Sequence, residues 1–322
     1  MNVKEKVLKE LENNKGSFVS GGSLATNLNV SRNSVWKAIN ALKKDGYVIE
    51  AKSNKGYQLM EDNDILSTWS ISKYLNNDFD IQVFDQVTST NTLLKEMAND
   101  GACEKTVIVA NEQTKGKGRT GKSFYSPKNS GVYLSLLLRP DITAQESLFI
   151  TTCAAVAVCK AIEDICDKKA YIKWVNDIFV DDKKVSGILT EASFNIETNK
   201  LDYVVLGIGI NIVTPSTGYP EDIANIATSL FHSQADSINK KSILIAHFLD
   251  YFWEYYKNFQ DKSYVQEYID RSMLLGKSIV IKQNNNNIKA LALDIDENCR
   301  LKVKLEDNTE MWLSSGEVSI VV

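Results

Sequence analysis

Hydrophobic positions in the first 60 residues recur at helical spacing three times and then alternate over two short segments. Val7, Leu8 and Leu11 predict one helix, which the turn at 13–16 ends. Two more helices are expected, one around 24–28 and one that Ser31 would cap and that runs to about residue 42. Segments 47–50 and 56–59 flank a turn and predict a hairpin. Residues 1–62 are therefore expected to form a winged helix-turn-helix domain.

Between residues 66 and 273 the pattern mixes long apolar helices with nearly continuous apolar strands. The predicted helices are 90–99, about 147–166, 243–259 and 264–271. The predicted strands are 106–110, 131–138, 171–174 and 203–212, with a hairpin turn near 181–183. Hairpins mixed with helices indicate an α+β domain with a mixed sheet rather than a repeating βαβ array.

The last segment, 274–322, changes to short strands separated by turn residues. Strands are predicted at 278–282, 289–295, 301–305 and 309–313. This pattern is typical of a small β-barrel-like domain. The acidic stretch 61–64, which has no periodicity, marks the boundary between the first domain and the second.

Composition places the chain among folded proteins of a reducing compartment. Apolar residues make up 43% and charged residues 24%, and the five cysteines contain no CxxC pair. No apolar run approaches the roughly 20 residues that cross a bilayer. The two histidines, His232 and His247, lie near no cysteine pair, so no protein metal cage is expected. We expect a cytoplasmic protein without a membrane partner.

Charge is divided unevenly along the chain. Residues 1–60 contain ten Lys or Arg against five Asp or Glu, a net of +5, whereas the remainder has 27 against 36, a net of −9. Because phosphate backbones attract clustered cations, only the first domain is expected to approach nucleic acid.

A glycine-rich loop at 112–122 carries the first candidate chemistry. Gly116, Gly118 and Gly121 leave backbone amides bare among the cations Lys115, Lys117, Arg119 and Lys122. Such a loop suits a phosphate or another anion. A dinucleotide-binding loop would open a helix, but a strand follows here, and a protein kinase would need a catalytic-loop histidine signature that is absent. A flexible surface hairpin stays open as the alternative.

Five motifs in order resemble those of biotin protein ligases, specifically of the bifunctional biotin operon repressors. They are Ser89–Asn91, Gly116–Gly121, Lys173–Asp177, Lys184–Glu191 and Gly207–Asn211. The resemblance implies a central domain of the biotin/lipoate ligase type and an SH3-like C-terminal domain. It also implies that biotin and ATP, with Mg²⁺, form biotinyl-5'-AMP, and that biotin then passes to a lysine of a biotin carboxyl carrier protein.

By the same resemblance, individual residues receive roles. Lys184 and Arg119 would be catalytic, because an acid that attacks a nucleotide phosphate needs cations to neutralise both anions. The residues implied to bind biotin are Ser89, Thr90, Asn91, Gln113, Lys117, Arg119, Lys184 and Gly187. Those implied to bind the nucleotide are Gly116, Lys117, Gly118, Arg119, Asn176 and Asn211. Asp177 would contact the metal or the acceptor lysine.

Several of these residues also have plainer interpretations. Ser89 and Thr90 could cap a helix, Asn176 and Asp177 could fix a turn, and Lys184 could be a surface lysine. Two positions depart from the family pattern: Lys117 stands where arginine is usual, and Val175 where proline is usual. The first change keeps the charge but loses bidentate geometry. Trp174 is expected to serve core packing.

In the first domain, the third helix would enter the major groove of operator DNA. The expected DNA contacts are Ser31, Arg32, Asn33, Ser34 and Lys37 on this helix, with Lys52 and Lys55 on the wing. The resemblance implies a homodimer, formed through the edge of the central sheet when the adenylate is bound. An alternative for the first domain is that it contacts only other proteins. Alternatives for the whole protein are a repressor without ligase turnover and a lipoate-type ligase.

Overall fold

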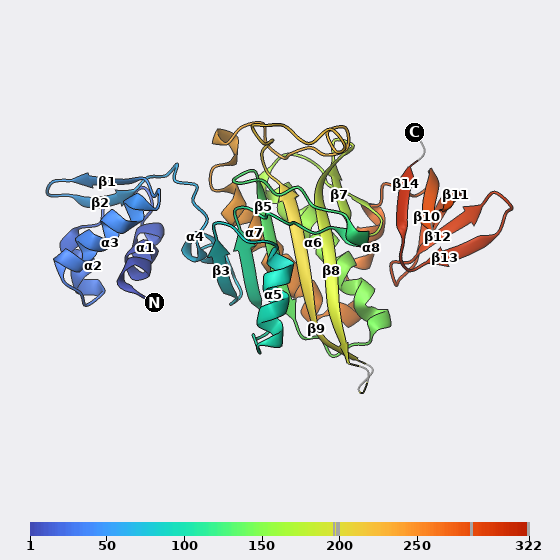
Figure 1. Ribbon diagram of the computed structural model, residues 1–322, viewed down its shortest axis with the longest axis horizontal. Helices are drawn as coiled ribbons and strands as arrows, with labels where there is room; N and C mark the ends of the chain where they lie inside the picture. Colours follow the sequence, from blue (N-terminus) through green and yellow to red (C-terminus); the bar gives the residue numbers. More distant parts are fainter. Residues whose placement is uncertain (196, 198–199, 284–285, 321–322) are drawn as a thin grey trace.

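The computed structural model describes residues 1–195, 197, 200–283 and 286–320. Figure 1 shows three units in sequence: a helical head at the N-terminal end, a central sheet covered by helices, and a small β domain at the C-terminal end. In these described ranges, each helix is too short or too polar to cross a membrane.

The head contains α1 (Val3–Asn13), α2 (Gly21–Asn27), α3 (Arg32–Lys44), β1 (Ile49–Lys52) and β2 (Gly56–Leu59). Ser31 caps α3 as predicted, because its Oγ accepts from the Ser34 amide at 3.0 Å. The first strand begins two residues later than the pattern predicts. The reason is that Tyr47 donates its amide to the Leu42 carbonyl and buries its ring in the core of the head. The winged helix-turn-helix prediction is confirmed.

Polar contacts fix the head to the central domain through the segment that follows β2. Lys73 pairs with the fully buried Glu12 carboxylate at 3.2 Å. Lys15 reaches the Asn63 carbonyl at 2.5 Å and the Asn239 side chain at 2.6 Å. The acidic stretch at the domain boundary is therefore part of an interface and contacts both sides of it.

The central sheet has seven strands in the order β3-β4-β5-β9-β8-β7-β6. β3 (Asp80–Phe84) runs parallel to β4 (Thr106–Ala110), and every other neighbouring pair is antiparallel, so the sheet is mixed as predicted. The remaining strands are β5 (Gly131–Leu138), β6 (Tyr171–Lys173), β7 (Asp177–Val180), β8 (Lys183–Asn195) and β9 (Lys200–Asn211). The prediction missed β3 and the short helix α4 (Thr68–Ser72).

Helices cover the two faces of this sheet unequally. α6 (Leu148–Ile165) and α7 (Lys240–Lys257) pack against each other and cover one face, while α5 (Thr90–Asn99) lies on the other, against β4, β5 and β9. α6 is apolar almost all round and is almost wholly buried. Because α5 covers only part of its face, the loops that follow the strands are left to build a site there.

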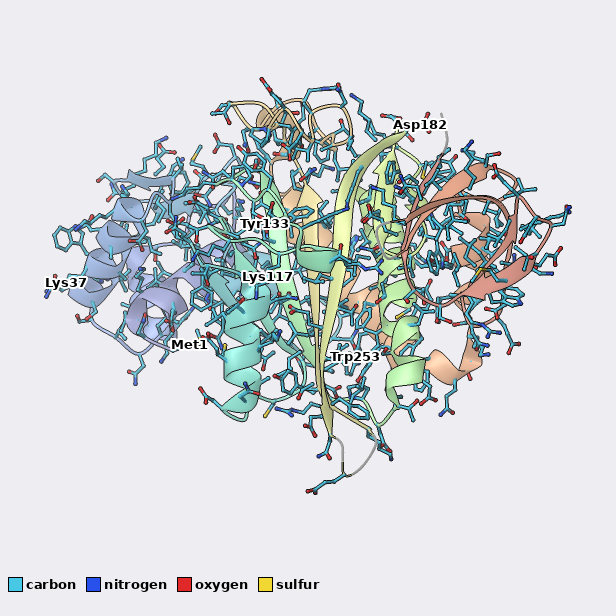
Figure 2. The ribbon with its side chains drawn as sticks, turned by 45° about the vertical axis from the view of Figure 1, so that its right-hand side comes forward. Met1, Lys37, Lys117, Tyr133, Asp182 and Trp253 are labelled. Carbon is cyan, nitrogen blue, oxygen red and sulfur yellow. The ribbon has the colours of Figure 1, made fainter. Side chains whose placement is uncertain are left out.

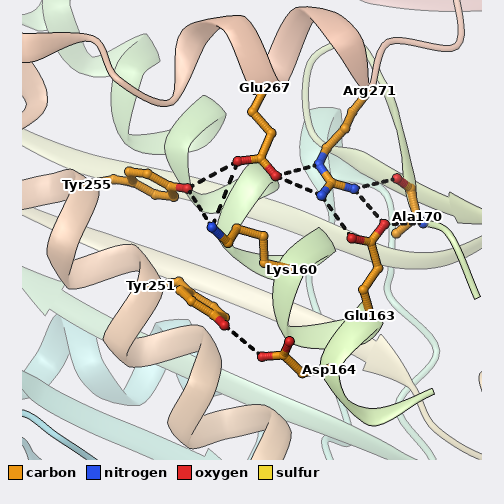
Figure 3. A network of polar contacts seen from close by, with 8 residues as sticks. All are labelled: Lys160, Glu163, Asp164, Ala170, Tyr251, Tyr255, Glu267 and Arg271. Atoms are coloured by element: carbon orange, nitrogen blue, oxygen red, sulfur yellow. Dashed lines mark hydrogen bonds and ion pairs between the residues drawn. The ribbon is translucent and has the colours of Figure 1, made fainter. Parts of the chain in front are cut away.

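A polar network ties three helices to the start of β6 (Figure 3). Arg271, directly after α8 (Val265–Asp270), pairs with Glu163 of α6 at 2.7 Å and with Glu267 at 2.7 Å. Burial alone would raise the pKa of Glu163, but hydrogen bonds from Arg271 and the Ala170 amide outweigh it and lower that pKa. The Arg271 carbonyl also accepts from the Ile172 amide at 2.8 Å. This network fixes β6 immediately before the Lys173–Asp177 motif.

The C-terminal domain is a five-stranded antiparallel sheet in the order β13-β12-β11-β10-β14, and it curls round in Figure 2. Its strands are β10 (Ser278–Gln283), β11 (Asn286–Ile295), β12 (Leu301–Leu305), β13 (Glu310–Leu313) and β14 (Glu317–Ile320). β14, absent from the prediction, pairs with β10 and returns the chain toward the central domain. Trp174 is buried as predicted and donates its indole N–H to the Cys299 carbonyl at 2.9 Å.

Candidate active site

A cavity opens on the face of the central sheet that α5 leaves partly uncovered. Arg119 of the glycine-rich loop and Lys184 of β8 both line it, although 64 positions separate them in the sequence. Figure 2 places the neighbouring Lys117 over the same sheet. The other predicted residues in its walls are Ser89, Thr90, Asn91, Gln113, Lys117, Gly118, Asn176, Asp177 and Gly187. The full lining of the cavity comes from six separate segments of the chain: 89–91, 113–124, 173–177, 184–189, 207–209 and 316–318.

Two adjacent residues, Asn176 and Asp177, hold the two cations in place. The Asp177 carboxylate pairs with the Lys184 ammonium at 2.6 Å, across the β7–β8 hairpin. The Asn176 side chain accepts from the Arg119 guanidinium at 2.7 Å and donates to the Ile188 carbonyl at 2.8 Å. Asn176 thus fixes a turn and orients Arg119 at the same time.

The glycine-rich loop is folded into one wall of the cavity. The Gly118 amide donates to the Lys122 carbonyl at 2.7 Å, and Thr120 adopts a left-handed conformation with φ 52°. The C-terminal domain contacts this wall at two points: Arg119 donates to the Gly316 carbonyl at 3.2 Å, and Lys122 pairs with Glu317 at 2.6 Å. The loop therefore has contacts with both the central and the C-terminal domain.

Two glycines of β9 leave room for other site residues. A side chain at Gly207 would collide with the Asn91 amide, and one at Gly209 would collide with the Phe124 ring. Because both β9 positions lack a side chain, Asn91 and Phe124 can lie directly on the sheet. This explains why the Gly207–Asn211 motif belongs to the site.

A buried hydrogen-bond network orients the polar side chains at one end of the cavity. Gln113 accepts from the Thr90 amide at 2.9 Å and from the Thr90 hydroxyl at 3.1 Å, and donates to the Ser126 hydroxyl at 2.9 Å. The fully buried Ser135 hydroxyl lies 2.7 Å from Thr90 Oγ1 and 2.5 Å from Asn91 Oδ1. These contacts orient the Gln113 amide. Sequence reasoning missed Ser135 because it lies inside an otherwise apolar strand.

Asn91 is held from its other side by an acidic residue. Its amide donates to Glu191 at 2.8 Å, and Glu191 also pairs with Lys95 at 2.7 Å. Burial would raise the pKa of Glu191, but the hydrogen bonds from Lys95 and Asn91 outweigh it and lower that pKa. Ser89 acts as the N-cap of α5, with its Oγ 3.5 Å from the Thr92 amide, so it caps a helix while lining the cavity.

Lys173 is a further cation of the cavity that the sequence analysis did not assign. Its side chain lines the cavity, and burial lowers its pKa, while Asp177 acts in the opposite direction. The sequence feature that could have assigned Lys173 to the site is its position in the same motif as Asn176 and Asp177. The cavity thus contains a lysine whose charge is more readily lost than that of an exposed lysine.

Gly116 and Asn211 are not among the residues that line the cavity. A side chain at Gly116 would meet the Phe124 carbonyl and the Ser126 hydroxyl, so this glycine permits the close packing of the loop. The Asn211 amide donates to the Thr228 carbonyl at 3.1 Å and anchors the long segment that follows β9. That segment also contacts β8, because the Lys184 amide donates to the Ile226 carbonyl at 2.8 Å.

Cations gather on the head as well. Arg32, Lys52 and Lys55 line one hollow between the start of α2 and the β1–β2 hairpin. The two lysine ammonium groups lie 5.8 and 5.7 Å from the centre of the Phe18 ring. Lys37 is at the outer end of the head, pointing away from the central domain (Figure 2). Ser31 and Ser34 bond to each other at 2.9 Å at the helix start, and Asn33 beside them is exposed.

Family models match each of the three units. Residues 3–58 match a helix-turn-helix domain, residues 83–211 the biotin/lipoate A/B protein ligase family, and residues 274–321 the biotin protein ligase C-terminal domain. The fold and the site therefore define a ligase of the biotin and lipoate class that carries a helix-turn-helix head.

Individual relatives extend over nearly the whole chain. A bifunctional ligase/repressor BirA from Bacillus spizizenii is 34% identical over 317 residues, covering 96% of this chain and 97% of its own. The Bacillus subtilis protein of the same name is 34% identical and covers 87% of each chain. The structure resembles the Aquifex aeolicus biotin protein ligase in complex with biotin and ATP, with a TM-score of 0.62 and 27% identity, over 75% of this chain and 98% of that one. The chain belongs to the biotin protein ligase family, in its bifunctional ligase/repressor form.

Proposed function

We propose that this protein joins biotin to ATP, releasing pyrophosphate and forming biotinyl-5'-AMP, and then transfers the biotinyl group to a lysine of a biotin carboxyl carrier protein. The convergence of Arg119 and Lys184 on one cavity supports this proposal most strongly. Two anions, a carboxylate and an α-phosphate, must meet there, and their mutual repulsion is offset by fixed cations.

Biotin has a polar ureido ring at one end and a carboxylate at the other. Thr90 and Gln113 would face the ureido ring, since their hydrogen-bond network already fixes which groups donate and which accept. Gly187 leaves space along the apolar tail, with the Lys184 ammonium close by. The carboxylate would then lie toward Lys184 and Arg119.

In the adenylation step, Lys184 would exchange its Asp177 partner for the reacting groups. Its ammonium would bridge the attacking carboxylate and the α-phosphate, where negative charge accumulates in the transition state. Arg119 would hold the phosphate from the other side, with Asn176 keeping its guanidinium oriented. Lys117 and Lys173 would add positive charge along the polyphosphate.

In the transfer step, Asp177 would serve the acceptor. An amine attacks only as the neutral base, so the incoming lysine has to lose a proton. The Asp177 carboxylate, freed when Lys184 turns to the adenylate, would accept that proton and orient the neutral amine toward the acyl carbon. AMP then leaves as the amide bond forms.

Mg²⁺ would accompany ATP and need not occupy a dedicated protein site. Among the described residues, no group of three or more His, Cys, Asp or Glu side chains is placed to hold a metal ion. The carboxylates of the cavity, Asp177 and Glu317, are each paired with a lysine. This donor set suits an ion held mainly by phosphate oxygens, and the ion would neutralise phosphate charge.

The same protein would act as a biotin-responsive repressor. The cationic face of the head would bind operator DNA, and retained adenylate would favour a homodimer. β7 pairs with β8 only up to Gly187, so the part of β8 from Leu189 to Phe194 has no strand on that side among the described residues. A second copy could add there in the same way. The segment after β9 supports coupling, because it contacts β8 at Lys184 and the head at Asn239.

A side-by-side assay separates this proposal from its alternatives. The purified chain is incubated with ATP, Mg²⁺ and either biotin or lipoate, with a carrier-domain acceptor, and the acceptor mass is measured. We expect the addition of biotin only. Addition of lipoate would favour the lipoate-type ligase, and no addition together with ligand-dependent DNA binding would favour a repressor without ligase turnover.

A further inference from the structure

The recognition helix of the head exposes a large apolar side chain. Trp36 in α3 is 55% exposed, whereas Val35, Ala38, Ile39 and Leu42 of the same helix are buried. A small domain with an otherwise filled core gains nothing in stability from an indole left in water. An exposed tryptophan of this kind commonly marks a contact surface.

The helical period places Trp36 on the outer face of α3. Arg32 and Asn33 precede it by one turn, and Asn40 follows it by one turn; all three are exposed. In Figure 2 the labelled Lys37, the next residue along α3, lies at the outer end of the head. The indole is therefore accessible to a partner that approaches the head from outside.

Cations lie on both sides of Trp36 along α3, with Arg32 one turn before it and Lys37 directly after it. A side chain at Gly22 would lie 3.0 Å from the Arg32 guanidinium, so the glycine makes room for Arg32 beside the wing lysines. Lys37 adjoins Trp36 on the other side. With a net charge of +5 on residues 1–60, this face is complementary to a polyanion.

The major groove of DNA offers one apolar group on its floor, the C5-methyl group of thymine. An indole between phosphate-binding cations matches that group, whereas lysines and serines do not. We propose that Trp36 packs against a thymine methyl group in the major groove and makes the head selective for thymine at that position. The inference rests on the proposed DNA-binding function and adds a base-reading residue to it.

The experiment uses the full-length protein with biotin, ATP and Mg²⁺ present. A pool of random-sequence duplexes is selected for binding, and the enriched duplex is then synthesised with each thymine in turn replaced by uracil, which removes only the methyl group. We expect one uracil position per half-site to weaken binding about fourfold, the effect of losing one buried methyl contact. Trp36→Ala should bind the thymine and uracil duplexes equally.

Two further variants test the assignment. Trp36→Phe keeps an apolar ring and should retain part of the thymine preference. Lys37→Ala should weaken binding to all duplexes alike and reduce its salt dependence. Each variant should melt at the wild-type temperature and form biotinyl-5'-AMP normally, since Trp36 and Lys37 lie far from the cavity.

The possible failures are distinguishable. If the wild-type protein enriches no sequence, the proposed repressor function fails and the inference fails with it. If it enriches a sequence but Trp36→Ala retains the same thymine preference, only the inference is overturned. If Trp36→Ala leaves DNA binding unchanged and instead weakens dimerisation or acceptor biotinylation, Trp36 contacts protein and the inference is also overturned.

Discussion

Lys184 and Asp177 form a 2.6 Å ion pair across the β7–β8 hairpin, inside the cavity that also contains Arg119. In the proposed mechanism, the pair holds the cation used in adenylation next to the carboxylate used in transfer. In that mechanism, each group would be released for its own step when substrate engages the other.

Removing the ammonium group should impair the first step most. Lys184→Ala should slow the formation of biotinyl-5'-AMP about 100-fold or more, because a charge-stabilising group in the transition state is lost. Pyrophosphate release in a single turnover measures this step. The affinity of the ligand-free protein for DNA should stay unchanged, which serves as the control.

Removing the negative charge of its partner should impair the second step. Asp177→Asn should still form the adenylate, but should transfer biotin to the acceptor more slowly, by about tenfold to 100-fold. The measurement is acceptor biotinylation started from preformed biotinyl-5'-AMP. Wild-type transfer rates in this variant would remove Asp177 from the mechanism.

The Ser135 hydroxyl should affect biotin binding through its neighbours. Ser135→Ala removes the contacts to Thr90 and Asn91, so the KM for biotin should rise about fivefold to tenfold with little change in kcat. Ser186→Ala is the matched control, because Ser186 is equally buried and its hydroxyl has no hydrogen-bond partner among the described residues. Equal effects of the two variants would argue against a positioning role.

Lys173 should make ATP binding weaken at a lower alkaline pH than an ordinary lysine would. Burial lowers its pKa below the usual 10.5, so it is charged at pH values below that lowered pKa and becomes neutral earlier than other lysines as the pH rises. The KM for ATP should therefore begin to rise at a lower pH than an ordinary lysine would impose. Lys173→Arg should move that rise to higher pH. Lys115→Arg, in the exposed part of the loop, should leave the profile unchanged.

The interface between the head and the central domain should depend on the buried Glu12. Lys73→Met leaves this carboxylate without its cation and should lower the free energy of unfolding by about 3 kcal/mol. Adding Glu12→Leu to it removes the unpaired charge and should restore most of the stability. Denaturant unfolding of the single and double variants tests this, and a double variant no more stable than the single one would contradict it.

The sequence predicted the three domains and most elements because hydrophobic periodicity and turn residues act locally. Three helices and strands in the central domain, 90–99, 106–110 and 131–138, begin and end where the pattern placed them. The misses have a common cause. β14 is four residues long and is defined by its pairing with β10, and β3 by its pairing with β4, neither of which local sequence reveals.

The site predictions also succeeded where local sequence carries the information and failed where distant contacts do. Motifs identified residues with charged or polar side chains, and the structure brings most of them to one cavity. Ser135 and Glu317 were missed and Glu191 was given no role, because each matters through a partner distant in sequence: Thr90, Lys122 and Asn91, respectively. Asn211 and Gly116 support the loops around the site and do not line the cavity. Whether a motif residue lines the cavity or supports a loop depends on packing, which residue type does not reveal.

The central claim is that a carboxylate and a nucleotide react between Arg119 and Lys184. The most direct measurement is native mass spectrometry of the full chain after incubation with biotin, ATP and Mg²⁺. We expect a bound species with the mass of biotinyl-5'-AMP in the wild-type protein and its near absence in Lys184→Ala. A wild-type protein that carries only unreacted biotin or ATP under these conditions would contradict the account.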